Sequence, residues 1–167
     1  MGIFMKAAYL LIGGNLGDRL AYLKSACEKI QQKGIKILRK SSVYETAAWG
    51  ITDQPSFLNQ VLEIETTEKP TRLLEELLSI EKSLGRERVE KNGARTIDID
   101  ILYFGEEIIS LPGLKIPHER IPIRKFVLIP LFELNPGFWD PKTEKTIAEM
   151  LKNCEDVLTV HVYEKNQ

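Results

Sequence analysis

Cysteine, net charge and long apolar runs are all scarce in this sequence, and each shortage excludes a class of protein. Two cysteines, Cys27 and Cys154, are too few for a metal cluster or a disulfide framework. The formal net charge is −1, whereas proteins that bind nucleic acid or anionic membranes usually carry a strong basic excess. No apolar run approaches the roughly 20 residues of a membrane span, and the amino-terminal stretch is too broken for a signal peptide. We therefore expect a cytoplasmic protein with no nucleic-acid and no membrane partner.

The length and composition are those of an ordinary globular domain. The chain has 167 residues, of which 43% are hydrophobic and 28% are charged. This length supports one well-packed core and is short for two domains. There is no internal repeat and no linker rich in glycine, proline or serine. We expect a single domain over residues 1–167.

Hydrophobic periodicity predicts the main elements. Asp18 is a natural cap for a helix that Gly34 ends, and its Cys27 falls on the apolar face, as expected of a reduced core thiol. Pro70 begins a second helix, which Gly85 ends. The predicted strands are residues 6–13, 35–46, 57–67 and 94–105, with a long loop at 47–56.

The order of these elements indicates an α+β fold. Strand, helix, strand, strand, helix, strand is typical of the ferredoxin-like (split βαβ) antiparallel sheet, with the helices on one face. Two additional C-terminal helices are predicted, around "KFVLIPLFEL" (125–134) and around 146–153. The alternating tail "VLTVHVYEK" (157–165) predicts an edge strand. The other face of the sheet is expected to be free, and function should lie there or at its rim.

Two aspartates interrupt the strand "ARTIDIDILYFG" (94–105), although aspartate is a poor strand former. Asp98 and Asp100 should point to the same face, about 6.6 Å apart along the chain. Two such charges repel unless a cation lies beside them, and carboxylates are ligands that suit Mg²⁺. The alternative interpretation is a solvated polar face.

Basic residues gather on both sides of this strand. Together with the carboxylates they suggest a site for a polyphosphate with its metal ions, because the guanidinium group of arginine binds phosphate oxygens in a bidentate fashion. The alternative is that they neutralise the acids and occupy loops. The residues are Arg86, Arg88, Lys91 and Arg95 before the strand, and Lys115, His118, Arg120, Arg124 and Lys125 after it.

At these residues the chain resembles the 6-hydroxymethyl-7,8-dihydropterin pyrophosphokinase family. The most specific segment is "KNGARTIDIDIL" (91–102), and the resemblance covers nearly the whole chain. Six other segments match in the family's order: "IGGNLGD", "SSVYET", "DQPSFLNQV", "IEKSLGRER", "IPHERI" and "RKFVLIPLFEL".

The resemblance implies an enzyme that transfers pyrophosphate from ATP to the hydroxymethyl group of the reduced pterin and releases AMP. It implies that Asp98 and Asp100 hold two Mg²⁺ ions on the triphosphate. Arg86 and Arg95, at the ends of a mobile loop, are implied to close over the transferring phosphates. Phosphoryl transfer depends mainly on positioning and charge stabilisation, which agrees with these assignments. Small molecules are then the expected partners, and a monomer the expected state.

The resemblance also implies the substrate contacts. A flat pterin is held well between aromatic rings, and an asparagine can donate to and accept from its edge at once. The expected ATP contacts are Glu81, Arg88, Ile101, His118 and Arg124. The pterin contacts that it implies are Thr46, Phe57, Asn59 and Phe126. Trp49 is added to them on a different ground, because the loop 47–56 that carries it is expected to cover the site as a lid.

Two features are assigned no ligand, and two other functions compete. We interpret "IGGNLGD" as a tight turn capped by Asp18, since it lacks a phosphate-loop motif, and His161 as an edge-strand residue. A ferredoxin-like RNA-binding module would need exposed aromatic residues and a basic face. A small-ligand domain of similar topology would not require the paired aspartates. Neither alternative predicts magnesium-dependent ATP binding.

Overall fold

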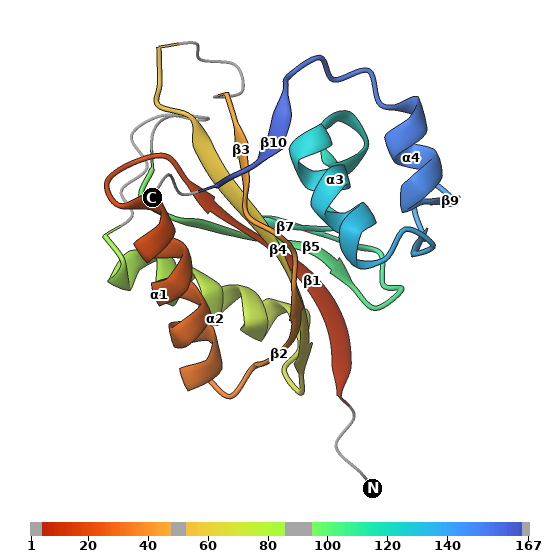
Figure 1. Cartoon of the computed structure of the whole chain (residues 1–167). Coiled ribbons are helices and arrows are strands. Elements are labelled where there is room, and N and C mark those ends of the chain that lie inside the picture. The colour runs from red at the N-terminus through yellow and green to blue at the C-terminus, as the bar shows by residue number, and fades with distance from the viewer. Residues whose placement is uncertain (1–4, 48–52, 86–94, 165–167) are drawn as a thin grey trace, which may run out of the picture.

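An antiparallel sheet separates two pairs of helices (Figure 1), with α1 and α2 against one face and α3 and α4 against the other. The structure is a computed structural model that describes residues 5–47, 53–85 and 95–164. The strands are β1 (Lys6–Gly14), β2 (Lys36–Lys40), β3 (Tyr44–Thr46), β4 (Phe57–Thr66), β5 (Asp98–Phe104), β6 (Ile109–Leu111), β7 (Leu114–Ile116), β8 (Trp139–Asp140), β9 (Lys145–Thr146) and β10 (Val160–Val162). The helices are α1 (Arg19–Gln32), α2 (Pro70–Ser83), α3 (Lys125–Leu134) and α4 (Ile147–Asn153), with a 3-10 turn at Ile121–Ile123.

The main sheet has the order β10-β3-β4-β1-β5, and β2 also pairs with β4. Three predicted strands are confirmed as β1, β4 and β5, and the fourth, 35–46, divides into β2 and β3. The division falls at Ser41, whose hydroxyl accepts the N–H of Val61 at 2.9 Å and so takes the place of a strand carbonyl. The mixed fold with an antiparallel sheet is therefore confirmed.

Alternate residues of β1 belong to two different cores. Ala8, Leu10 and Ile12 pack with residues of α1 and α2, whereas Tyr9 and Leu11 pack with α3 and α4. This explains why the strand is apolar at nearly every position. The expectation that helices cover only one face was wrong, because α3 and α4 bury part of the second face.

The predicted helix boundaries are confirmed by their caps. The Asp18 carboxylate accepts the N–H of Ala21 at 3.1 Å, and Pro70 is the first residue of α2. Gly34 and Gly85 end the two helices with φ of +83° each, a conformation that glycine adopts at little cost. Cys27 is buried on α1 as predicted. Within the described ranges, no helix has the length and hydropathy needed to cross a membrane.

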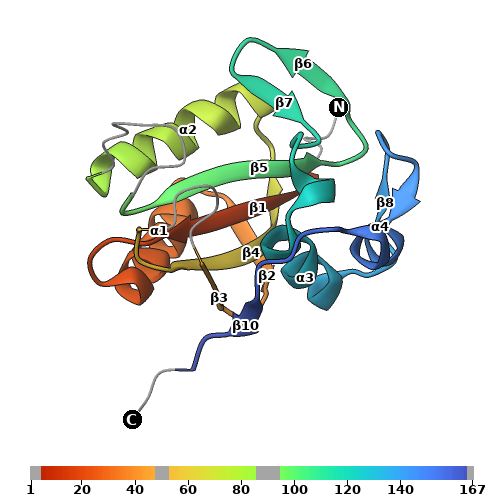
Figure 2. The same cartoon turned by 90° about the horizontal axis from the view of Figure 1, so that it is seen from above.

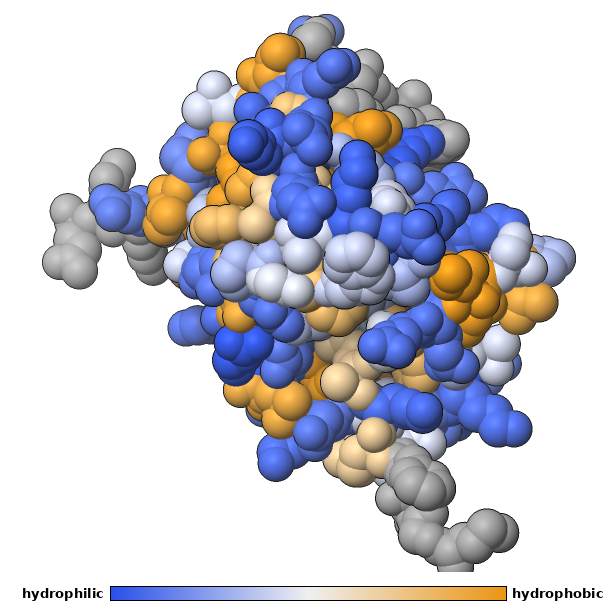
Figure 3. Space-filling model, turned by 90° about the vertical axis from the view of Figure 1, so that its right-hand side faces the viewer, coloured by the Kyte–Doolittle hydropathy of each residue, from blue (hydrophilic) through white to orange (hydrophobic). Residues whose placement is uncertain are grey.

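The C-terminal third adds both expected and unexpected elements. The helices predicted around 125–134 and 146–153 are confirmed as α3 and α4, and the predicted edge strand is confirmed as β10, which pairs with β3. The hairpin of β6 and β7 was not predicted, and it lies near β5 at the opposite side of the sheet (Figure 2). Figure 3 shows the face beside α3 and α4 as mostly hydrophilic, with hydrophobic residues in separate small groups.

Candidate functional site

Three polar or small residues form a row across the strands β5, β1 and β4, near one end of each strand. Strand pairing places Asp98 of β5 beside Gly13 of β1, and Gly13 beside Asn59 of β4. Asp100 likewise lies beside Leu11. As predicted, the aspartates point away from α1 and α2, because the alternating Ile99 and Ile101 belong to the core on that side. The row therefore opens on the part of the second face that α3 leaves accessible.

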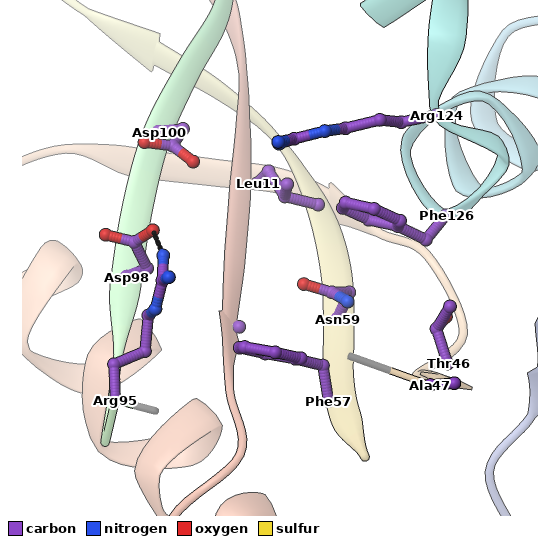
Figure 4. A pocket seen from close by; sticks show the side chains of 11 residues that line it. Leu11, Thr46, Ala47, Phe57, Asn59, Arg95, Asp98, Asp100, Arg124 and Phe126 are labelled. Atoms are coloured by element: carbon purple, nitrogen blue, oxygen red, sulfur yellow. Dashed lines mark hydrogen bonds and ion pairs between the residues drawn. The ribbon is translucent and has the colours of Figure 1, made fainter. Parts of the chain in front are cut away.

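A first cavity lies over this row (Figure 4). It brings together the described residues that were predicted to bind pterin, and it adds both aspartates and two arginines to them. Trp49, the remaining predicted contact, lies outside the described residues. The lining residues are Leu11, Gly13, Thr46, Ala47, Phe57, Asn59, Arg95, Asp98, Asp100, Arg124 and Phe126.

Each phenylalanine of this cavity is paired with an arginine. The Arg95 guanidinium lies 5.5 Å from the centre of the Phe57 ring, and that of Arg124 lies 5.4 Å from the centre of the Phe126 ring. Cation–π contacts of this kind hold the rings in place. Thr46 contributes a buried Oγ1 that finds no hydrogen-bond partner among the described residues. A buried hydroxyl without a partner is costly, and a polar ligand would satisfy it.

A second cavity adjoins the first and is larger, at about 320 Å³ against about 60 Å³. Asp98, Asp100, Arg95 and Arg124 line both cavities, so they stand where the two meet. Among the predicted ATP contacts, Ile101, His118 and Arg124 line the second cavity, together with the cations Lys115 and Arg120.

The other predicted ATP-side residues fall elsewhere. Glu81 lines neither cavity: it is buried, and its Oε2 accepts the N–H of Ile99 at 2.6 Å. It thus supports the strand that carries the aspartates. Arg86 and Arg88 lie outside the described residues.

The surroundings of the Asp98 and Asp100 carboxylates favour the binding of a cation. Burial raises the pKa of Asp100 to about 8, Asp98 and Glu81 add to the rise, and Arg124 and Arg95 oppose it. Arg95 forms an ion pair with Asp98 at 2.7 Å. Burial lowers the pKa of Arg124 to about 10, and Arg120 adds to that shift.

This donor set fits Mg²⁺ only together with a ligand. Among the described residues there is no group of three or more His, Cys, Asp or Glu that could hold a metal by itself. Mg²⁺ is usually bound by one or two carboxylates, with substrate phosphates and water completing its shell. Asp98 and Asp100 therefore fit an ion that arrives with a polyphosphate.

His118 is positioned to donate a hydrogen bond into the second cavity. The backbone N–H of His118 donates to the Leu102 carbonyl at 3.0 Å, and the ring Nδ1 of His118 accepts the backbone N–H of Arg120 at 3.2 Å. Burial lowers the pKa of His118, and Arg124 and Arg120 lower it further. The ring is then neutral at pH 7 with its proton on Nε2. His161, by contrast, lies on β10 outside both cavities, as expected.

Sequence reasoning missed three residues that shape the site. Leu11 and Gly13 form part of the first cavity, and a glycine inside a strand is the signal that could have pointed to a close approach by a ligand. Asn15, in the turn after β1, donates to Gln54 at 3.1 Å and to the Pro55 carbonyl at 2.9 Å. Nothing in the turn "IGGNLGD" alone indicates those distant partners.

Comparison with known proteins places the chain in a family. A family model described as 7,8-dihydro-6-hydroxymethylpterin-pyrophosphokinase matches residues 9–136. The chain belongs to this family. Two bacterial members, each named 2-amino-4-hydroxy-6-hydroxymethyldihydropteridine pyrophosphokinase, are similar over most of both chains. The protein of Aquifex aeolicus is 40% identical, covering 87% of this chain and 90% of its own length. That of Haemophilus influenzae is 39% identical, covering 91% and 95%.

Some of the proteins similar to this chain are much longer than it is. The chain is 41% identical to the "Folic acid synthesis protein fol1" of Pneumocystis carinii but spans only 20% of it. Among solved structures, a Plasmodium falciparum HPPK-DHPS chain is similar with a TM-score of 0.71 at 16% identity, covering 89% of this chain and 45% of that one. At this identity the likeness shows the fold alone.

Proposed function

We propose that this chain transfers pyrophosphate from ATP to the hydroxymethyl group of 6-hydroxymethyl-7,8-dihydropterin, a step of folate biosynthesis. The names of the Aquifex and Haemophilus relatives, which match over nearly their whole lengths, support this activity. The observation that carries the proposal is the junction of the two cavities, where Asp98, Asp100 and Arg95 line both. If ATP lies in one cavity and the pterin in the other, the pyrophosphate group is transferred at this junction.

The first cavity suits the pterin. Its narrow space between Phe57 and Phe126 matches a flat ring, which stacks on aromatic faces. Asn59 lies between the two phenylalanines in Figure 4, and its amide both donates to and accepts from the pterin edge. The buried hydroxyl of Thr46 adds a polar contact. Trp49 remains a predicted contact and lies outside the described residues.

The second cavity suits the nucleotide. Arg124, Arg120 and Lys115 supply positive charge for the triphosphate, and His118 donates a hydrogen bond through Nε2. Ile101 provides an apolar wall. Asp98 and Asp100 would hold two Mg²⁺ ions, which when bound neutralise the charge of the phosphates.

The reaction itself needs positioning more than acid–base catalysis. A bond forms between the hydroxymethyl oxygen and the β-phosphorus of ATP, and the bond from that phosphorus to the oxygen of the α-phosphate breaks, so that AMP leaves. The hydroxyl proton passes to solvent. Arg95, whose ion pair with Asp98 places it at the junction, stabilises the charge on the transferring phosphates, and Arg86 is proposed to act with it. Glu81 and Arg88 are proposed to support ATP binding.

Several properties of the whole protein follow as proposals. The four predicted strands lie in the sheet in the order 35–46, 57–67, 6–13, 94–105, which supports a ferredoxin-like arrangement. We infer one domain over residues 1–167, a monomer and a cytoplasmic location. Size-exclusion chromatography with light scattering would test the oligomeric state.

The decisive experiment is identification of the products. The protein is incubated with ATP, Mg²⁺ and 6-hydroxymethyl-7,8-dihydropterin, and the products are separated and identified by mass spectrometry. Equal amounts of AMP and pterin diphosphate are expected, with no product when Mg²⁺ is replaced by a chelator. Formation of ADP, or binding without turnover as in a ligand-binding module, would reject the proposal.

A further inference from the structure

Arg19 occupies a position that the stability of its own helix does not explain. It is the first residue of α1, directly after the cap Asp18. The amino terminus of a helix carries partial positive charge and favours anions, so a cation there is unfavourable. The Arg19 side chain is nevertheless ordered by contacts and only 23% exposed. The contacts of Arg19 with residues outside α1 explain why an arginine stands at this position.

One nitrogen of Arg19 joins β3 to the residue that precedes β4. Nη1 donates to Oε2 of Glu45 at 2.6 Å and to the carbonyl of Ser56 at 2.9 Å. Glu45 directly precedes Thr46, and Ser56 directly precedes Phe57. Thr46 and Phe57 are paired across β3 and β4, and both line the first cavity. Arg19 therefore holds the strand ends that carry two walls of that cavity.

The C-terminal strand completes this arrangement. The Arg19 guanidinium lies 5.4 Å from the centre of the Tyr163 ring, where the residue that follows β10 lies beside the start of α1 (Figure 1). The N–H of Tyr163 donates to the Val43 carbonyl at 2.8 Å, and His161 lies 3.4 Å from Glu45. The β3 strand is thus held from α1 and from β10 at once.

We propose that Arg19 is a positioning residue for the pterin cavity, which keeps Thr46 and Phe57 at the spacing the substrate needs and uses Tyr163 of the C-terminal segment as its support. This inference rests on the proposed function for the identity of the ligand. Arg19 contacts neither cavity itself, so it acts through the two strand ends. The Glu45 carboxylate is part of the device: its hydrogen bond from Arg19 lowers the pKa of Glu45 and keeps it charged.

The test compares Arg19→Ala and Arg19→Lys with a matched control. Arg72→Ala removes an arginine that is also in the first turn of a helix and also paired with glutamate, but its partners Glu75 and Glu76 lie on its own helix. We expect Arg19→Ala to raise KM for the pterin by about tenfold or more, as misplaced substrate-positioning groups do. KM for ATP should stay within about twofold of the parent, because the misplaced walls belong to the pterin cavity alone. Arg19→Lys, which keeps the positive charge on a single donor nitrogen, should recover part of the loss. Arg72→Ala should behave as the parent.

A second measurement separates this proposal from the proposed function. Hydrogen exchange of the amides in residues 44–46 and 57–58 should be faster in Arg19→Ala and Tyr163→Leu than in the parent and in Arg72→Ala, whatever the substrate is. An inactive parent would count against the proposed function alone, since the exchange readout remains. An unchanged pterin KM, equal rises in both KM values, or unchanged exchange would overturn the role of Arg19. If Arg19→Ala does not fold, Arg19→Lys and Tyr163→Leu carry the same two readouts.

Discussion

Asn15 and Arg95 are joined by two hydrogen bonds of 2.9 Å although they lie 80 residues apart. The N–H of Asn15 donates to the Arg95 carbonyl, and Oδ1 of Asn15 accepts the N–H of Arg95. The same side chain donates to Gln54 and to the Pro55 carbonyl. Asn15 is only 2% exposed. One buried amide therefore fixes the start of the aspartate strand and the end of the segment 47–56 together.

Replacement of Asn15 by alanine should weaken both stability and catalysis. The change removes the side-chain hydrogen bonds to the Arg95 N–H and the Pro55 carbonyl, each of which typically contributes about 0.5–1.5 kcal/mol. The midpoint of urea unfolding should fall accordingly, and kcat should fall because Arg95 is no longer held at the cavity junction. Asn135→Ala, which removes a single bond to Tyr9 at the far end of the sheet, is the control. If both variants keep the parent's kcat, Asn15 does not position Arg95.

The sequence predicted those parts of the site that depend on alternation along one strand. Asp98 and Asp100 on one face, with Ile99 and Ile101 on the other, follow from the two-residue period of a strand. The predicted contacts Thr46, Phe57, Asn59 and Phe126 came from motif order, and the structure brings them into one cavity.

What sequence reasoning missed depends on contacts between distant segments. The pairs Asn15–Arg95 and Arg19–Glu45 join residues of ordinary polar type, and no local pattern marks either partner. The β6–β7 hairpin was not predicted because each of its strands has three residues, which are too few to reveal the two-residue alternation of a strand. The burial of the second face of the sheet was missed because α3 is apolar on most sides. The hydrophobic pattern of such a helix does not indicate which side packs against the sheet.

Gly13 should tolerate no side chain. A Cβ added there would lie 2.1 Å from Oδ1 of Asn59 and 2.8 Å from the Leu58 carbonyl, so Asn59 must rotate away or the strands must separate. Either response removes the amide that is proposed to read the pterin edge. We expect Gly13→Ala to weaken pterin binding at least about tenfold, the loss typical of a buried polar contact. Calorimetry with a non-hydrolysable ATP analogue present would measure it.

The control for this substitution is Gly137→Ala, because a Cβ at Gly137 would meet no atom within 4 Å. That variant should bind the pterin as the parent does. Parental pterin affinity in a folded Gly13→Ala protein would show that Asn59 is not the main polar contact.

Asp100→Asn should stabilise the metal-free protein while abolishing its activity. The folded pKa of Asp100 is raised to about 8, above its ordinary value, so the stability it contributes is complete below the ordinary pKa and is lost as pH rises toward 8. Asparagine does not ionise, so the melting temperature of the variant should exceed that of the parent increasingly from about pH 4 to pH 8. Added Mg²⁺ and ATP should stabilise the parent only.

Asp140→Asn provides the opposite case at another buried carboxylate. Asp140 accepts hydrogen bonds from Tyr103 at 2.6 Å and from the N–H of Lys142 at 2.7 Å, which an amide cannot fully replace. That substitution should lower the melting temperature. An Asp100→Asn protein that is less stable than the parent at pH 8 without metal would contradict the proposed repulsion.

His118 should make the protein sensitive to mild acid. Burial and the neighbouring arginines lower its folded pKa below the ordinary value near 6.5, so the folded state resists the proton that the unfolded chain accepts. The stability that the neutral ring contributes is complete above about pH 6.5 and is lost as pH falls from there toward the folded pKa. His118→Gln removes this titration, so the free energy of unfolding should depend less on pH between 7 and 5 than in the parent. Urea unfolding at several pH values measures the slope, and His161→Gln, at the exposed edge strand, is the matched control. A His118→Gln protein with the parent's slope would show that His118 is not the group held neutral beside the phosphate site.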